Sequence, residues 1–172
     1  LGLNDQVIDI AITANRPDGM SLVGIAREVS AITGNNLKLP KIIKEQDNLI
    51  DTSFNLCTSI VDKNGIYTLT YIDKLDGNIE SPKALQIRLE NSGIKSLNAI
   101  VDVTNYVMLE QGQPLHAFDV DSLNEITQKE VTYKDFSIRK AIQGETLLAL
   151  DGKEYKLSSE TNLITCHNYP IA

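Results

Sequence analysis

The sequence has 172 residues, of which 42% are hydrophobic and 23% charged, so it can bury an ordinary core in one domain or two small ones. Its formal net charge is −7, whereas a protein that grips nucleic acid through the phosphates normally carries a basic face. A stand-alone RNA-binding protein is therefore disfavoured, and any RNA contact should be local or depend on neighbouring domains.

The first predicted elements are a strand, a turn and a helix. Residues 7–13 alternate with period two, which is typical of a strand, and residues 14–19 read as a turn held by an Arg16–Asp18 pair. Apolar residues at helical spacing predict an amphipathic helix from Ser21, a good N-cap, to Thr33. The polar stretch 35–55 is expected to be a surface connector.

The middle of the chain predicts a hairpin and a second helix. Residues 54–61 and 66–72 flank Asn64-Gly65, a strong hairpin signal because both residues tolerate positive φ. After a turn at 76–78, Ser81 is expected to cap a helix over 82–92 that has proline at its first position.

The remainder of the chain predicts one short helix and then strands. Residues 105–110 could be helical, and strand-like runs follow at 131–133, 136–141, 146–149, 154–157 and 163–166, with a hairpin turn at Asp151-Gly152. The sum is an α+β protein with antiparallel or mixed, layered and partly barrel-like sheets and about two main helices packed on one side. The helix-containing half covers about 1–119 and the strand-rich half about 120–172.

Several features indicate the cellular setting. No apolar run could span a bilayer and no signal peptide is visible, so we expect a cytoplasmic protein with no membrane partner. Cys57 and Cys166 lie far apart, which favours two free buried thiols over a disulfide or a metal site. The chain starts at Leu1 rather than Met and stops at Ala172 without a capping signal, which we interpret as a fragment of a longer protein.

The densest mixture of apolar and short polar residues is the stretch from Gly93 to Asp119, GIKSLNAIVDVTNYVMLEQGQPLHAFD. Its polar members Asp102, Thr104, Asn105 and His116 could form a functional site, or they could be cap residues and a half-buried histidine bonded to the backbone. There is no nucleophile–base motif, no glycine-rich phosphate loop and no metal-ligand spacing. The adjacency of Cys166 and His167 is not evidence of a pair in space.

This stretch closely resembles the B3/B4 domain of bacterial phenylalanyl-tRNA synthetase beta subunits, whose motif reads V-D-x-TNY, LE-x-GQP and HAFD. The flanking segments also match the family. Residues 12–29 resemble its T-x-NR-x-D and GxARE motifs, and residues 144–152 resemble its turn that contains GE and LDG. The resemblance covers nearly the whole chain as one editing domain over residues 1–172.

The resemblance implies an enzyme. The parent is an alpha2beta2 ligase that attaches phenylalanine to tRNA-Phe with ATP and Mg²⁺, and its alpha subunit carries that reaction. The B3/B4 domain hydrolyses Tyr-tRNA-Phe made in error, with no cofactor or metal of its own. The resemblance implies that His116 and Asn105 are catalytic residues that position the terminal adenosine, the ester or the attacking water. It also implies that Thr104, Asn105 and His116 bind the substrate, with Thr104 helping to shape the pocket.

Beyond Ala172 the family pattern continues into a glycine-rich segment and a carboxylate thought to read the tyrosine hydroxyl. We therefore expect a C-terminally truncated editing pocket, and a fragment that edits weakly or not at all. The alternative is a structural or amino-acid-binding module without catalysis. The two readings differ in whether Thr104, Asn105 and His116 meet at an open pocket or point into packed core.

Overall fold

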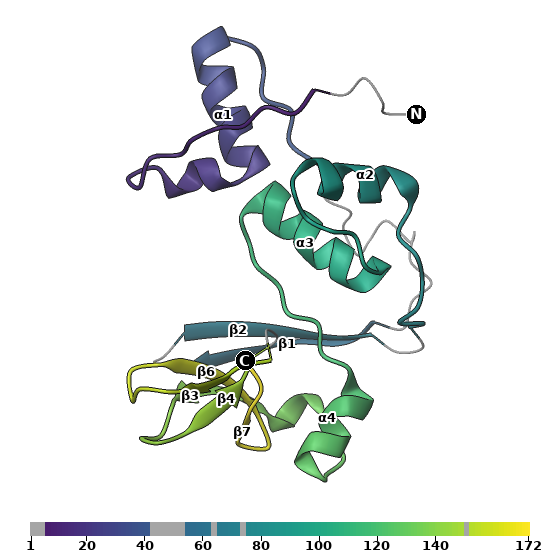
Figure 1. The fold of residues 1–172 in the computed structure, drawn as a ribbon, viewed down its shortest axis with the longest axis vertical. Coiled ribbons are helices and arrows are strands. Elements are labelled where there is room, and N and C mark those ends of the chain that lie inside the picture. The colour runs from purple at the N-terminus through teal and green to yellow at the C-terminus, as the bar shows by residue number, and fades with distance from the viewer. Residues whose placement is uncertain (1–5, 42–53, 63–64, 73–74, 150–151) are drawn as a thin grey trace. The chain divides into compact units, whose positions relative to one another are not determined.

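The computed structural model describes residues 6–41, 54–62, 65–72, 75–149 and 152–172 (Figure 1). It divides the chain into two compact units: the first draws on Leu1–Ile50 and Asp76–Ala117, and the second on Asp51–Leu75 and Phe118–Ala172. Helices dominate the first unit, and small antiparallel sheets dominate the second. The protein is therefore α+β, as the sequence predicts.

Helix α1, Leu22–Thr33, lies where the sequence predicts it in the first unit. The Ser21 hydroxyl accepts a hydrogen bond from the Gly24 N–H at 3.0 Å, which satisfies one of the free donors of the first turn. Gly34 ends the helix with a φ of 70°, a left-handed conformation that glycine adopts without a steric penalty. Of the predicted connector, residues 35–41 contain no helix or strand and residues 42–53 lie outside the described part.

The predicted strand at residues 7–13 is wrong, because this segment has no regular structure and its Ile8 side chain is 79% exposed. Alternating apolar residues form a strand only when a neighbour takes up the backbone hydrogen bonds, and no described strand pairs with this segment. Ile12 instead packs on Gly19 of the 3₁₀ helix η1, Pro17–Met20, 3.1 Å from where a Cβ would lie. Gly19 therefore provides space for Ile12 and does not reverse the chain through a positive φ.

Arg16 ties the turn before η1 to α1. Its Nη2 atom lies 2.9 Å from Asp18 Oδ2, as predicted, and 2.5 Å from Glu28 Oε1 on α1. All three side chains keep 44–49% of their surface exposed, so the cluster contributes little to stability.

Helices α2, Lys83–Asn91, and α3, Ala99–Gln111, pack against each other in the first unit, where Leu89 of α2 is fully buried. Helix α2 confirms the predicted helix, but Pro82 and not Ser81 occupies the N-cap position. Helix α3 begins at Ala99 rather than at residue 105, because Asn98 caps it and brings the preceding apolar residues into the helix.

The second unit contains the predicted hairpin. Strands β1, Phe54–Asp62, and β2, Gly65–Ile72, pair antiparallel with Asp62 opposite Gly65, and the register shifts between Asn55 and Cys57. Strand β1 also contacts β3, Phe136–Lys140, of the three-stranded sheet.

Helix α4, Val120–Thr127, was not predicted from the sequence. The Asp119 carboxylate accepts a hydrogen bond from the Asp121 N–H at 3.0 Å and so caps the helix. Next to α4, the Phe118 and Phe136 rings lie 6.3 Å apart in a tilted arrangement. The described residues thus contain four α-helices, and the prediction of about two main helices was wrong.

Two small sheets complete the second unit. Strands β3, β6 (Asn162–Cys166) and β7 (Tyr169–Pro170) form an antiparallel sheet in the order β3-β6-β7, and β4 (Thr146–Leu148) pairs antiparallel with β5 (Glu154–Lys156). The predicted strand at 131–133 is wrong: Thr132 caps the 3₁₀ helix η3, Tyr133–Asp135. Among the described strands every pair is antiparallel and no closed barrel forms.

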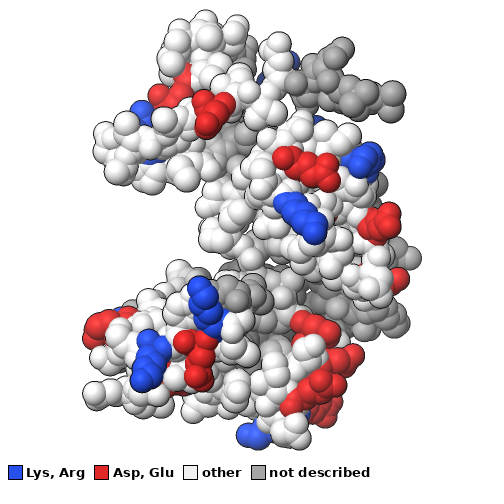
Figure 2. Space-filling model, viewed as in Figure 1, with Lys and Arg blue, Asp and Glu red and all other residues white. Residues whose placement is uncertain are grey.

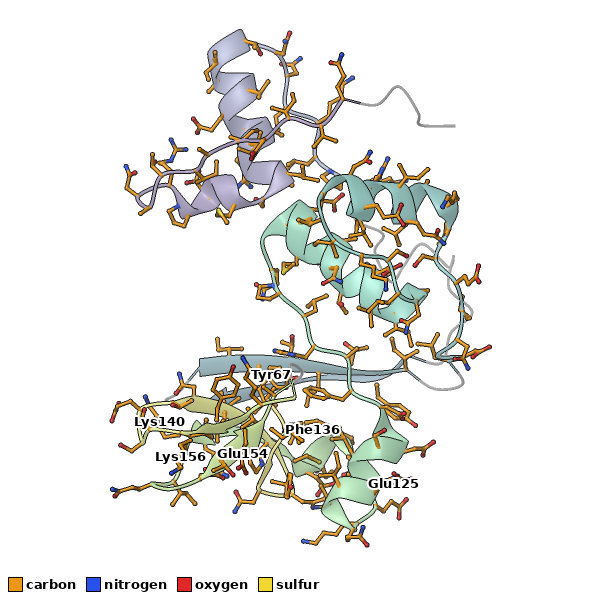
Figure 3. All side chains as sticks on the ribbon, viewed as in Figure 1. Tyr67, Glu125, Phe136, Lys140, Glu154 and Lys156 are labelled. Carbon is orange, nitrogen blue, oxygen red and sulfur yellow. The ribbon has the colours of Figure 1, made fainter. Side chains whose placement is uncertain are left out.

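Charged side chains lie on the outside of the second unit. Lys140 of β3 and both Glu154 and Lys156 of β5 extend into solvent (Figure 3). On the face shown in Figure 2, most of the surface is uncharged, acidic and basic side chains are scattered over it, and acidic ones gather over α4. The described residues on this face form no basic stripe of the kind that tracks a nucleic-acid backbone.

Candidate functional site

The polar residues singled out from the sequence lie on α3 and in the segment that follows it. The Asn98 carboxamide oxygen accepts a hydrogen bond from the Val101 N–H at 3.0 Å, and the Asn98 carbonyl accepts one from the Asp102 N–H at 2.9 Å. Gly112, with a φ of 76°, ends the helix, and its N–H donates to the Met108 carbonyl at 2.8 Å. Both ends of α3 are therefore fixed by the motif itself.

Asp102, in the first turn of α3, is fully buried. Its carboxylate accepts three hydrogen bonds: from the Ser81 hydroxyl at 2.6 Å, the Ser96 hydroxyl at 2.5 Å and the Leu97 N–H at 2.9 Å. Burial by itself raises the pKa of the Asp102 carboxyl, but the three hydrogen bonds outweigh burial and hold this pKa below its usual value. Asp102 is thus a buried, ionised anchor and does not face solvent as a reactive group.

Thr104 and Asn105 are neighbours in the middle of α3, and both are half-buried. The Thr104 hydroxyl donates to the Val101 carbonyl at 2.7 Å, within its own helix, and keeps its lone pairs as acceptors. Asn105 lies one helical turn after Asp102. The sequence predicted both residues and a helix over 105–110, but not the Asn98 cap, which starts the helix earlier and so includes Thr104.

His116 lies in the irregular segment after the Gly112 cap, and its side chain is exposed. All three predicted site residues therefore belong to the first unit, two of them on α3 and one beyond its C-terminal end. Their convergence on a single pocket stays a prediction.

Cys166 and His167 do not form a catalytic pair. The Cys166 thiol is free and fully buried, and burial, with a smaller effect from Asp135, raises its pKa, which disfavours the thiolate. The His167 ring instead lies 3.0 Å from the Glu130 carbonyl and 3.3 Å from the Asp135 carboxylate. Cys57, the other predicted free thiol, lies in a strand whose side chains are not described.

Comparison with known proteins adds the decisive observation: a family model described as "B3/4 domain" matches residues 63–172, well over half of the sequence. The chain belongs to the B3/4 domain family. The match includes β2, α2, α3, α4 and the last sheet, and so contains every predicted site residue.

The relatives of this B3/4 chain are proteins named "Phenylalanine--tRNA ligase beta subunit". One from a strain of Prochlorococcus marinus is 54% identical over 178 residues, covering 100% of this chain and 21% of the relative. One from Synechococcus sp. (strain CC9605) is 50% identical over 172 residues, covering 100% of this chain and 20% of the relative. The chain thus spans about a fifth of the length of these relatives.

Sequence reasoning missed the partners of Asp102 in this B3/4 chain. From the sequence, Ser81 was interpreted as a helix cap because proline follows it. Nothing in the sequence indicated a role for Ser96, since a lone serine in a connector is common. A useful signal would have been an aspartate inside an apolar helical run, because a buried carboxylate requires donors from elsewhere.

Within the described ranges, no group of three or more His, Cys, Asp or Glu side chains is arranged to hold a metal ion. No helix in the described part of the chain is both long and apolar enough to cross a membrane.

Proposed function

We infer that this chain is the B3/4 domain of a phenylalanine–tRNA ligase beta subunit, and that it hydrolyses Tyr-tRNA-Phe formed in error. The observation that carries this proposal is the similarity, along the whole chain, to beta subunits of that ligase. The GQPLHAFD and VTNY segments, which the resemblance assigns to editing, are present without interruption.

Physical chemistry gives a reason for such a site. A pocket built for phenylalanine rejects a side chain that merely adds a hydroxyl by only about a hundredfold. A second site can instead bind that hydroxyl with polar groups, which phenylalanine would leave unpaired at a cost in free energy. Selective hydrolysis at this second site removes the error after transfer to tRNA.

In this proposal His116 and Asn105 position the ester, the terminal adenosine or the attacking water, and Thr104 shapes the pocket. Exposed His116 can reach a substrate, and the half-buried Asn105 amide offers both donor and acceptor groups. No covalent intermediate is required, because an oriented water and stabilisation of the developing oxyanion suffice for ester hydrolysis.

The parent enzyme supplies the remaining parts of the proposal. An alpha subunit, in an alpha2beta2 assembly, would carry the ATP- and Mg²⁺-dependent ligase reaction, which we place outside this chain. The net charge of −7 fits a domain that receives the 3′ end of tRNA-Phe while other parts of the enzyme grip the RNA. The proposed setting is the cytoplasm, where protein synthesis uses the product.

A second candidate is a structural or amino-acid-binding module without catalysis. The observation that favours it is that Asp102 and Thr104 already form hydrogen bonds inside the first unit. In that case the motif would serve the fold and the binding of an amino acid, and no ester would be hydrolysed.

The two candidates are separated by a deacylation assay. The ligase is assembled from the complete beta subunit and its alpha subunit, and preformed Tyr-tRNA-Phe and Phe-tRNA-Phe are offered to the parent and to His116→Ala. Editing predicts fast hydrolysis of the tyrosyl ester only, and a large loss in the variant. A parent that binds Tyr-tRNA-Phe without hydrolysing it would favour the binding module.

A further inference from the structure

The buried Asp102 cluster joins three separate parts of the first unit at one carboxylate. Ser81 precedes α2, Ser96 and Leu97 belong to the connection between α2 and α3, and Asp102 itself lies in the first turn of α3. All three donor–acceptor distances lie between 2.5 and 2.9 Å, as expected for hydrogen bonds to a charged acceptor. The start of α3 is therefore fixed both along its axis and in rotation.

The hydrogen bonds of this cluster are short, and the one from Ser81 is shielded from solvent. Asp102 has no exposed surface and Ser81 is 5% exposed, so their hydrogen bond lies in a low-dielectric environment. A buried carboxylate that loses a donor keeps its desolvation cost without the compensating bond, so the arrangement resists small shifts. Leu89 of α2 is also fully buried, and α2 packs against α3.

Helix geometry connects this anchor to the proposed site. Residues three apart on a helix are neighbours, separated by a rise of about 4.5 Å and about 60° in rotation. Asn105 is therefore the site residue adjacent to Asp102, whereas Thr104 points about 160° away from it. A rotation of the helix start would change the aim of the Asn105 amide directly.

We propose that Asp102, held by Ser81 and Ser96, is the positioning residue for Asn105 in the editing reaction. The inference rests on the proposed function and assigns Asp102 no contact with the substrate. Its effect should appear in turnover, because a displacement of about 1 Å at a positioned group can cost about a hundredfold in rate.

The test uses the complete ligase with Ser96→Ala, Asp102→Asn, Asn105→Ala and the double variant Asp102→Asn/Asn105→Ala. Ser96→Ala leaves the carboxylate with two donors and keeps the test valid if Asp102→Asn fails to fold. Ser96→Thr retains the hydroxyl that Ser96→Ala removes, so it should hydrolyse Tyr-tRNA-Phe near the parental rate. Glu145→Gln, in the other unit, is the matched control for a general loss of stability.

We expect Ser96→Ala and Asp102→Asn to lower kcat for Tyr-tRNA-Phe hydrolysis about tenfold or more, with KM and phenylalanine attachment near parental values. In the Asn105→Ala background, Asp102→Asn should have little further effect, since the two residues act through one group. Equal losses with Glu145→Gln, or full additivity of the double variant, would overturn the inference.

The same variants distinguish a failure of the proposed function from a failure of the positioning role. If Asn105→Ala and His116→Ala both hydrolyse Tyr-tRNA-Phe at the parental rate, the proposed function of these residues fails. If Asn105→Ala is impaired but Ser96→Ala and Asp102→Asn are not, the proposed function stands and the positioning role of Asp102 is wrong.

Discussion

The ion pair between Arg139 and Glu145 makes a quantitative prediction about the stability of the second unit. Arg139 of β3 donates two hydrogen bonds to the Glu145 carboxylate, at 2.8 and 2.6 Å, and Ile142 N–H donates a third at 2.8 Å. A further Arg139 donor reaches the Asn168 carbonyl at 2.9 Å in the turn between β6 and β7. The pair therefore joins β3 and the turn that follows it to the turn between β6 and β7, and its side chains are only 20% and 15% exposed.

The magnitude follows from the pKa of Glu145. The hydrogen bond from Arg139, then that from Ile142, lower this pKa from 4.5 to about 2. A difference of this size corresponds to about 3 kcal/mol of stability, and because the pair keeps some contact with water we expect about 2 kcal/mol. A lowered carboxyl pKa stabilises the folded state above the unfolded-state pKa, near 4.5, and this stabilisation disappears as the pH falls towards 2.

The assay is urea unfolding of the parent and Glu145→Gln across this pH range. At neutral pH the variant should be less stable by about 2 kcal/mol, and the gap should close between about pH 4.5 and about pH 2. The other carboxylates titrate in both proteins, so their contribution cancels when the two free energies of unfolding are subtracted. A gap that stays constant across the range, or no gap at neutral pH, would refute the reasoning.

Three further substitutions test the first unit, each measured by the free energy of unfolding. Leu89→Ala should cost about 3 kcal/mol because Leu89 is fully buried, and a loss below about 1 kcal/mol would contradict its place in the core. Gly24→Ala should cost at least about 2 kcal/mol, since the new Cβ would lie 1.7 Å from the Asp18 carbonyl oxygen; an unchanged midpoint would exclude this close approach. Asn98→Ala should cost about 1 kcal/mol through loss of the α3 cap, and Asn98→Asp, which keeps the cap, should cost less.

Local signals in the sequence were enough to predict some elements. The Ser21 cap with Gly34 located α1, and Asn64-Gly65 located the hairpin of β1 and β2. A helix cap and an Asn-Gly pair are strong signals because each acts on the backbone locally, without help from distant residues. The family, too, was identified from one uninterrupted motif.

Other features depended on contacts that the sequence does not show. The apolar alternation at 7–13 predicted a strand, but an alternating pattern does not provide a pairing partner. Helix α4 was missed because its short run, VDSLNEIT, follows an aspartate that had been read as part of the preceding motif. Asp102 was recognised as unusual, yet its role depended on Ser81, which is 21 residues earlier in the chain.

The measurement that tests the central claim most directly is single-turnover hydrolysis of Tyr-tRNA-Phe by the complete ligase, compared with its His116→Ala variant. Phenylalanine attachment by the same preparations shows that both are folded and assembled. The editing assignment predicts a loss of about a hundredfold in hydrolysis with attachment unchanged. Hydrolysis at the parental rate in the variant would contradict the role of His116 and of the site built around it.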